Sequence, residues 1–335
     1  MENINEIHVV TGAAGRMGFP LAIELKKRGK YVRALCHTDN AISARLRGIA
    51  DEVVFGDIRI QKDAETAFAG AAYVYHLAGV ISIESKPTPA LRAVNVEGTR
   101  NVVNACIKAR VKRLIHTGSV HAVDFTNATD ILTEPERYKP DRVYGAYAAT
   151  KAEGCNLVLD GVLHNGLDAV IALPSGVIGA YEYKLSNFGQ MITDIANRKL
   201  PAYIAGEYDF VDAEDAALAL ADLAEKGVKG ESYFISGHKI TVKELVFTAA
   251  GIAGVKPPRF KAPYFFAKMF APGAEKRSIK RGKLPTYSPY SVRILRDNCN
   301  FSHEKLTLLT GYNPRPLEAS LRAQIIFQRE LEKDK

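Results

Sequence analysis

The sequence predicts an α/β protein in which a doubly wound parallel sheet carries a smaller, mixed C-terminal lobe. Two observations predict the sheet and a third predicts the lobe. Across the first 175 residues, short β-branched runs alternate with amphipathic helical stretches, and a glycine-rich turn joins the first pair. Such alternation is typical of parallel strands linked by right-handed helical crossovers, which cover both faces of the sheet. After Pro174 the alternation becomes irregular.

The elements of the first half follow from this alternation in chain order. The strands are short apolar runs, and the helices are longer stretches in which apolar residues recur every three or four positions. Strands are expected at residues 7–10, 31–36, 53–55, 73–77, 114–116 and 169–173, and helices at 17–28, 63–69, 90–109 and 146–163.

The second half interleaves the end of the sheet with a separate lobe. Strands at 209–211 and 233–235 are expected on either side of a helix at 214–226. The stretch from 256 to 316 carries most of the later prolines and tyrosines and is expected to be irregular. A final amphipathic helix is expected at 317–332.

The length and composition of the chain fit this two-part organisation. Its 335 residues are enough for a full hydrophobic core, and 47% of them are hydrophobic and 24% charged, with no repeat or low-complexity tract. We expect residues 1–175 and 206–236 to form the sheet domain and residues 176–205 and 237–335 to form the second lobe.

Three features of the sequence predict the cellular compartment of the protein. The four scattered cysteines show neither metal-ligand nor redox spacing, which predicts free thiols in a reducing compartment and no metal site. The acidic N-terminus leads directly into the first apolar run, which leaves no room for a signal peptide. No stretch reaches the ~18 apolar residues of a membrane span. We therefore expect a cytoplasmic protein without a membrane partner.

The formal net charge of +8 at pH 7 is partly concentrated in one segment. It contains Lys276, Arg277, Lys280, Arg281 and Lys283. This cluster is either a solvated basic face or a rim that attracts a phosphate-bearing cofactor or an acidic substrate. No aromatic residues alternate with these charges and no nucleic-acid-binding motif is present, so we expect no nucleic-acid partner.

The glycine-rich turn between the first strand and the first helix predicts a dinucleotide site. The segment Thr11-Gly12-Ala13-Ala14-Gly15-Arg16-Met17-Gly18 follows the pattern TGxxGxxG. Gly12 allows a sharp turn, Gly15 lets the backbone approach a pyrophosphate, and Gly18 lets the helix pack closely on the strand. The helix N-terminus then offers unpaired N–H groups to the phosphates, so we expect a Rossmann domain that binds cofactor through this segment.

The residues after the second and third strands indicate which cofactor binds. A carboxylate that selects NAD is expected about 20 residues beyond the glycine loop, but Cys36 holds that position. Arg16 and His37 could instead face a 2′-phosphate, which favours NADP(H), with NAD(H) as the alternative. Asp57 and Ile58 follow the third strand and are expected to meet the adenine ring.

A tyrosine, a lysine and a serine predict acid–base chemistry at one edge of the sheet. Tyr147 and Lys151 are four residues apart, on one face of the expected helix 146–163. A free tyrosine has a pKa of about 10, and a nearby cation would lower that pKa. Ser119 follows the fifth strand, at the edge where doubly wound folds bind ligands, and could hold a substrate oxygen.

These motifs resemble the extended short-chain dehydrogenase/reductase family, part of the NAD-dependent epimerase/dehydratase superfamily. The resemblance covers nearly the whole chain. Within the family, residues 32–35 and 94–102 are most similar to the dihydroflavonol reductase and 3β-hydroxysteroid dehydrogenase branch. Further matching segments are residues 76–79, 95–99, 173–179, 209–212, 300–305 and 311–312.

The resemblance implies an activity and residue roles. Hydride would move between a nicotinamide and a ketone or aldehyde, while Tyr147 transfers the proton, Lys151 activates Tyr147 and anchors the ribose, and Ser119 binds the carbonyl oxygen. Asn95 matches an asparagine that is more structural than chemical, and family members often form homodimers through the helices that carry Asn95 and Tyr147. The cofactor would also contact Leu77, Ala78, Gly79, Pro174 and Val177.

Two departures and two alternatives qualify this interpretation. His37 stands where plant-type reductases carry an arginine, and Gly118 replaces the usual serine before Ser119. A nucleotide-sugar epimerase that retains NAD would use the same three residues, but its frequent Tyr-Gly pair is replaced by residues 121–123. A non-catalytic cofactor sensor commonly loses the tyrosine or the lysine, and both are present here.

The substrate is the least determined part of the prediction. His121, two residues beyond Ser119, and Asn187 are candidates for substrate contact. The later aromatic residues could line a pocket for a flat or steroid-like molecule or could simply form the core of the second lobe. They are Tyr181, Tyr183, Phe188, Tyr203, Tyr264, Phe265 and Phe266.

Overall fold

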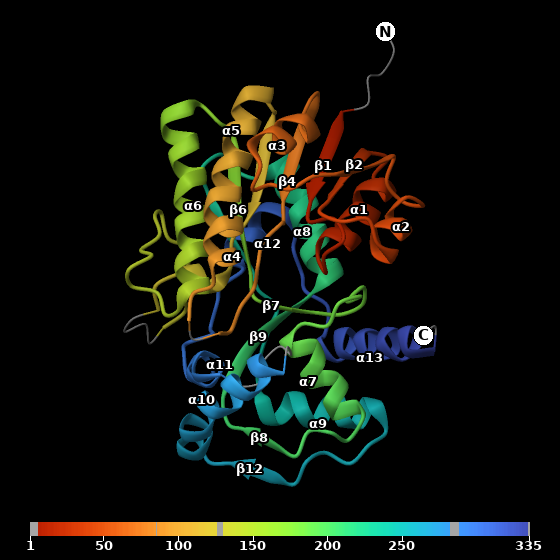
Figure 1. The fold of residues 1–335 in the computed structure, drawn as a ribbon, viewed down its shortest axis with the longest axis vertical. Helices are drawn as coiled ribbons and strands as arrows, with labels where there is room; N and C mark the ends of the chain where they lie inside the picture. The colour runs from red at the N-terminus through yellow and green to blue at the C-terminus, as the bar shows by residue number, and fades with distance from the viewer. Residues whose placement is uncertain (1–5, 85, 126–129, 282–287, 334–335) are drawn as a thin grey trace.

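The computed structural model describes residues 6–84, 86–125, 130–281 and 288–333. Its main element is a parallel sheet of seven strands in the order β10-β6-β5-β4-β1-β2-β3 (Figure 1). The strand order reverses beside β1, so that the carboxyl ends of β1 and β4 open a crevice for a ligand. The Rossmann prediction is thereby confirmed. The strands are β1 (Ile7–Thr11), β2 (Tyr31–Cys36), β3 (Glu52–Phe55), β4 (Ala71–His76), β5 (Arg113–Thr117), β6 (Ala169–Pro174) and β10 (Ser232–Ile235).

Two hydrophobic clusters cover the two faces of this sheet. Successive strand residues point to opposite faces, so Val9 packs in one cluster and Val10 in the other. One face is covered by α3 (Gln61–Ala67), α5 (Thr99–Ala109) and α6 (Ala146–Asn165). The opposite face is covered by α1 (Gly18–Lys27), α2 (Ala41–Leu46), α8 (Ala213–Lys226) and α12 (Glu304–Thr310).

The expected helix 90–109 is present but is not regular. It begins as α4 (Pro89–Arg92), widens into a π-helical turn (Ala93–Gly98) and continues as α5. A π-helical turn rotates the residues that follow it and occurs often at functional sites. Here it contains Asn95, which is buried.

The second lobe has a small sheet and several helices. Three strands, β7 (Gly176–Ile178), β9 (Glu207–Asp212) and β11 (His238–Thr241), form a sheet in the order β11-β9-β7. The strand expected at 209–211 therefore lies in this sheet and not in the large one. The other elements are β8 (Ala202–Ile204), β12 (Phe260–Ala262), α7 (Asn187–Ala196), α9 (Val242–Ala253), α10 (Tyr264–Lys280), α11 (Pro289–Ile294) and α13 (Leu317–Lys333).

The expectation of an irregular stretch between 256 and 316 was wrong. In the described residues this stretch contains β12, α10, α11 and α12. Three of the prolines that suggested loops lie at helix starts: Pro263 precedes α10, Pro289 is the first residue of α11, and Pro316 precedes α13. Proline is favoured at such positions because the first N–H groups of a helix have no intrahelical partner.

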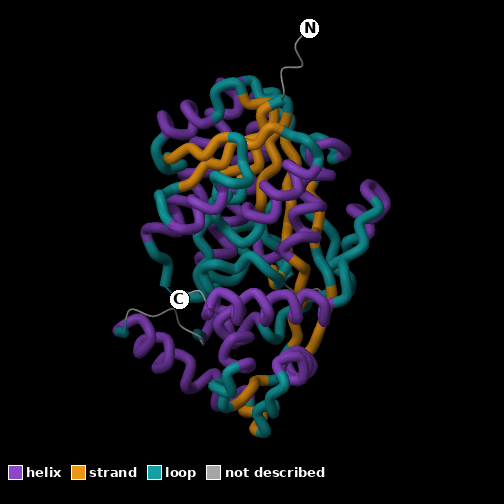
Figure 2. Tube along the Cα trace, turned by 90° about the vertical axis from the view of Figure 1, so that its right-hand side faces the viewer, coloured by secondary structure: helices purple, strands orange, loops and turns teal. Residues whose placement is uncertain are grey.

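Figure 2 shows the strands of the large sheet in the upper part of the molecule and the largely helical second lobe below them. Within the described residues, no helix has both the length and the apolar character needed to cross a bilayer.

Candidate active site

The glycine loop leaves no room for side chains on its inner side. Gly12 has a positive φ of 66°, and a Cβ there would lie 2.8 Å from the backbone nitrogen of Ala78. A Cβ on Gly18 would overlap the Gly12 carbonyl oxygen, so α1 can start directly against β1 only with glycine at this position. Met17 is the N-cap of α1. This close, backbone-lined turn at a helix start fits a dinucleotide pyrophosphate.

A buried polar network holds the segment that follows β4 against this loop. The Thr11 hydroxyl accepts a hydrogen bond from the Ala78 N–H at 3.1 Å and contacts His76 Nδ1 at 2.9 Å. Asn95, in the π-helical turn, binds both the N–H and the carbonyl oxygen of Val80. The segment Leu77, Ala78 and Gly79 is therefore held between the glycine loop and Asn95. Asn95 positions this segment through its bonds to the Val80 backbone.

Arg16 lies away from the end of β2. Its guanidinium forms an ion pair with the buried Glu182, donates to the Val177 carbonyl oxygen, and donates to the Ser186 hydroxyl at 2.8 Å. Sequence reasoning missed Glu182, because the acid lies 166 residues from Arg16 in the chain. The structure thus joins Arg16 to the second lobe and gives no support to its expected contact with a 2′-phosphate.

The ends of β2 and β3 meet in a charged cluster. His37 Nε2 lies 3.3 Å from the Asp57 carboxylate, which also pairs with Arg59. These neighbours lower the pKa of Asp57 to about 2, mainly through the Arg59 hydrogen bond. Arg47, beyond β2, pairs with Asp39 at 2.8 Å. Ile58 is buried and packs under the π-helical turn, where a Cβ on Gly98 would meet it.

Ser119, Tyr147 and Lys151 come together at the carboxyl end of β5. The Ser119 side chain lies close enough to the Tyr147 phenol to act on its pKa, and Lys151 Nζ donates to the Thr117 carbonyl oxygen at 2.7 Å. Gly79 faces this group, since a Cβ on it would lie 3.4 Å from Lys151 Nζ. Three residues predicted from separate motifs therefore share one site.

Burial dominates the acid–base properties of this group. It raises the pKa of Tyr147 to about 12, although the Ser119 hydrogen bond acts in the opposite direction, and it lowers the pKa of Lys151 to about 8. The lowering of the Tyr147 pKa expected from Lys151 is therefore not found. The phenol is protonated at neutral pH, as a proton donor must be.

The packing of β5 and α6 explains the glycine before Ser119. A Cβ on Gly118 would lie 2.8 Å from both Cys155 Sγ and Leu173 Cδ2. A serine at this position would need a rearranged core, so the missing hydroxyl is a consequence of how α6 packs on β6.

An imidazole and two phenols surround Tyr147 on the side of the second lobe. His121 Nε2 lies 2.7 Å from the Tyr208 hydroxyl, and the His121 ring packs edge-on against the rings of Tyr147 and Tyr290. Burial lowers the pKa of His121 to about 4, which keeps its ring neutral at pH 7. Tyr290 is buried, and its hydroxyl finds no hydrogen-bond partner among the described residues. Sequence reasoning missed Tyr208 and Tyr290, since neither lies in a local motif.

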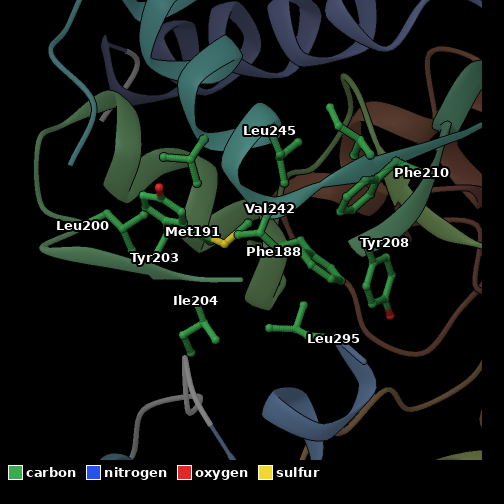
Figure 3. A pocket seen from close by; sticks show the side chains of 12 residues that line it. Phe188, Met191, Leu200, Tyr203, Ile204, Tyr208, Phe210, Val242, Leu245 and Leu295 are labelled. Atoms are coloured by element: carbon green, nitrogen blue, oxygen red, sulfur yellow. The ribbon is translucent and has the colours of Figure 1, made fainter. Parts of the chain in front are cut away.

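Tyr208 also forms one wall of a small apolar cavity in the second lobe (Figure 3). Phe188 packs edge-on against Tyr208 at this end of the cavity, and Asn187, the first residue of α7, precedes Phe188. Tyr203 lines the cavity, whereas Tyr181 and Tyr183 pack between Phe19 and Phe327 as core. The remaining lining residues are Met191, Leu200, Ile204, Phe210, Ile240, Val242, Leu245, Val246 and Leu295.

Some of the other predicted residues lie at the junction of the two lobes and others lie away from it. Pro174 ends β6 and Val177 lies in β7, both at the junction of the two lobes. Phe265 and Phe266 lie on the exposed side of α10 and do not line the cavity. Of the basic cluster, Lys283 falls outside the described residues.

Comparisons with known proteins agree with this geometry. The chain is 28% identical to the sterol demethylase protein B of Methylococcus capsulatus over 96% of this chain and 98% of that protein. It is 27% identical to a putative dihydroflavonol 4-reductase of Synechocystis over 93% of this chain and 91% of the relative. The crystal structure of gox2253 matches with a TM-score of 0.83 at 28% identity, covering 98% of this chain and 99% of that one. A family model matches residues 8–236. The chain belongs to the NAD-dependent epimerase/dehydratase family.

Proposed function

We propose that this NAD(P)-dependent oxidoreductase reduces a ketone or aldehyde, or oxidises the corresponding alcohol, at the Ser119–Tyr147–Lys151 group. One observation carries the proposal: the Tyr147 phenol is buried beside Ser119 at the ligand-binding edge of the sheet, and this burial raises its pKa to about 12. A phenol in this state can give its proton to a carbonyl oxygen as the carbon is reduced.

The site residues divide this work between them. The bound nicotinamide supplies or accepts the hydride. Ser119 holds the substrate oxygen next to the Tyr147 hydroxyl, and Tyr147 donates the proton. Lys151, with Nζ anchored on the Thr117 carbonyl, lies beside Gly79 and is placed to bind the cofactor ribose.

We propose NADP(H) as the preferred cofactor, with NAD(H) also accepted. The His37 imidazole and the Arg47 and Arg59 guanidinium cations lie around the ends of β2 and β3. The Arg47 and Arg59 pairs are partly exposed, so a 2′-phosphate would compete with their carboxylates. Arg16 plays no part in this preference, because it is engaged by Glu182.

We propose a substrate with a large apolar body, bound by the second lobe formed by residues 176–205 and 237–335. The cavity beside Tyr208 is lined almost wholly by apolar side chains, and small-molecule sites are lined mainly by such residues. Two relatives are named for sterol and dihydroflavonol chemistry, and both kinds of molecule are built on fused ring systems. His121, with its ring against Tyr147, would contact the polar end of the substrate, and Asn187 would contact it near Phe188.

We further propose a homodimer that pairs through α5 and α6, and a cytoplasmic location. The four cysteines are free, which fits a reducing compartment. Light scattering of the purified protein would test the dimer, and a monomeric mass would exclude it.

The test of the activity is the consumption of NADPH and NADH with a panel of ketones, aldehydes, flavanonols and sterol ketones. Tyr147→Phe should lower turnover by ~10²–10⁴-fold while leaving cofactor binding intact. Tyr73→Phe, which alters a tyrosine on β4 that stacks on His8, is the matched control and should have no such effect.

No turnover with any carbonyl, together with nucleotide retained through purification, would favour the epimerase alternative. His121→Ala with unchanged turnover would remove His121 from the site.

A further inference from the structure

Helix α10 exposes a row of large apolar side chains. Phe265 is 70% exposed, Phe270 64%, Met269 51% and Phe266 49%. The three phenylalanines contact one another, with ring centroids 5.9 and 6.4 Å apart along the helix. Large apolar side chains gathered on a surface mark a site that binds another molecule.

The charges around this row are of one sign. Between residues 256 and 281 the only carboxylate is Glu275, which is buried. None of the basic side chains in this segment pairs with a carboxylate of the described chain, and all of them are exposed. They are Lys256, Arg259, Lys261, Lys268, Lys276, Arg277, Lys280 and Arg281.

The apolar and basic residues share one side of α10. At 3.6 residues per turn, Phe265 and Met269 lie on the same face as Lys276 and Lys280. The two lysines follow Met269 by about two turns or more. The exposed face is therefore apolar in its first half and basic in its second half. Long basic side chains can keep their charged ends in a polar layer while their stems lie along apolar surface.

The opposite side of α10 packs next to the apolar cavity. Ala267 and Ala271 pack on Ile204 and Leu295, and both of these residues line the cavity. Figure 1 shows α10 at the end of the second lobe that is remote from the large sheet. A molecule bound to the exposed face would thus lie one helix away from the cavity.

We propose that α10 docks the protein on the surface of an anionic phospholipid bilayer, with Phe265, Phe266, Met269 and Phe270 inserted among the lipids and the basic residues on the phosphate headgroups. Exposed aromatic side chains beside clustered lysines and arginines are the features that bind such interfaces. A second copy of the chain fits less well, because two identical basic faces would repel each other. This proposal differs from the expectation of no membrane partner, which rested on the lack of a membrane-spanning segment; docking on a bilayer surface needs no such segment.

Docking would let an apolar substrate pass from the bilayer toward the cavity. Only this passage of substrate rests on the proposed function. The docking itself is independent of catalysis. Tyr147→Phe protein should therefore bind vesicles as the unaltered protein does, which separates a failure of the docking proposal from a failure of the proposed activity.

The test is cosedimentation of the full chain with vesicles of pure phosphatidylcholine and with vesicles that also contain phosphatidylglycerol. We expect binding to the anionic vesicles, weakened at high salt, and little binding to the neutral ones. Phe265→Ser/Phe270→Ser and Lys276→Glu/Lys280→Glu should each weaken that binding at least tenfold. Leu163→Ser/Leu308→Ser, which alters two equally exposed apolar residues on other helices, is the matched control and should bind normally.

Other outcomes would overturn the proposal. One is failure of the unaltered protein to sediment with anionic vesicles, and another is equal binding by the Phe265→Ser/Phe270→Ser variant. A dimer that this variant converts to monomer, with no vesicle binding, would assign the face to a second copy. Turnover of a water-soluble carbonyl should be unchanged in the variant, which shows that the fold is intact.

Discussion

The guanidinium of Arg16, in the glycine loop, forms a buried ion pair with the carboxylate of Glu182, in the second lobe. Glu182 also accepts hydrogen bonds from the Ser186 N–H at 2.7 Å and from Gln324 of α13 at 2.7 Å. Gly189 leaves the space that this carboxylate occupies, since a Cβ there would overlap it. The pair therefore ties the nucleotide-binding loop to α7 and α13.

Glu182→Gln should lower the free energy of unfolding by about 3–5 kcal/mol, because it leaves a buried guanidinium without its countercharge. Urea denaturation measures this loss. Asp39→Asn breaks the exposed pair with Arg47 and should lower stability far less, because solvent screens that pair. A Glu182→Gln protein as stable as the Asp39→Asn protein would show that the pair does not hold the lobes together.

Gly145→Ala should damage both stability and turnover. Gly145 precedes α6 with a φ of 92°, and a Cβ there would lie 2.6 Å from the Tyr290 ring. We expect a loss of roughly 1–3 kcal/mol from backbone strain, with a further loss from the clash, and a clear fall in kcat/KM as Tyr290 and Tyr147 shift.

The control for this substitution is Gly166→Ala, at the other end of α6. Gly166 has a φ of 70°, but nothing lies within 4 Å of a Cβ there. It should cost only about 1–2 kcal/mol of left-handed strain and leave turnover unchanged. Equal effects of the two substitutions on turnover would show that the Tyr290 contact does not matter for the site.

Tyr290→Phe should lower kcat/KM for the substrate without lowering the free energy of unfolding. It removes a buried hydroxyl that lacks a partner among the described residues, so unfolding free energy should stay equal or rise by up to about 1–3 kcal/mol. If that hydroxyl binds a polar group of the substrate beside Tyr147, kcat/KM should fall about tenfold, which corresponds to ~1.4 kcal/mol of lost binding. Tyr208→Phe removes the partner of His121 and should instead destabilise. Unchanged kcat/KM in Tyr290→Phe would exclude the hydroxyl from substrate binding.

Four buried histidines should make the protein less stable in acid. Burial lowers the pKa of His76 to about 3, of His8 and His121 to about 4, and of His116 well below its usual value. The unfolded chain binds protons below about pH 6.5 while the folded chain does not, so stability is lost as pH falls from there toward the folded pKa values. Each histidine contributes a slope of about 1.4 kcal/mol per pH unit.

His116→Leu isolates one of these contributions. Both ring nitrogens of His116 are buried without a partner among the described residues, so leucine loses no hydrogen bond. Between pH 6 and pH 5 the variant should lose about 1.4 kcal/mol less stability than the unaltered protein. Urea midpoints at the two values measure this, and the exposed His164, changed to asparagine, is the control. An identical slope in His116→Leu would contradict the burial argument.

Much of the fold could be predicted because its signals are local. Apolar runs at residues 7–10 and 31–36 marked β1 and β2, and the spacing of Gly12, Gly15 and Gly18 marked the turn into α1. Helices α7, α9 and α10 were not predicted. Helix α10 was hidden by two features. It contains a proline, which suggested a loop, and it carries apolar residues on its exposed side, so its apolar residues do not follow the one-sided pattern of a helix packed on a core.

By itself the sequence determined the Rossmann sheet, the glycine loop and the Ser119, Tyr147 and Lys151 group. Each depends on residue type and spacing within one strand–turn–helix unit, or on one edge that all parallel strands share. Only the tertiary structure decided that Arg16 meets Glu182, that Tyr208 and Tyr290 reach Tyr147, and that burial raises the Tyr147 pKa. Those facts depend on how the second lobe packs on the first, and contacts between residues more than a hundred positions apart leave no periodic signal in the chain.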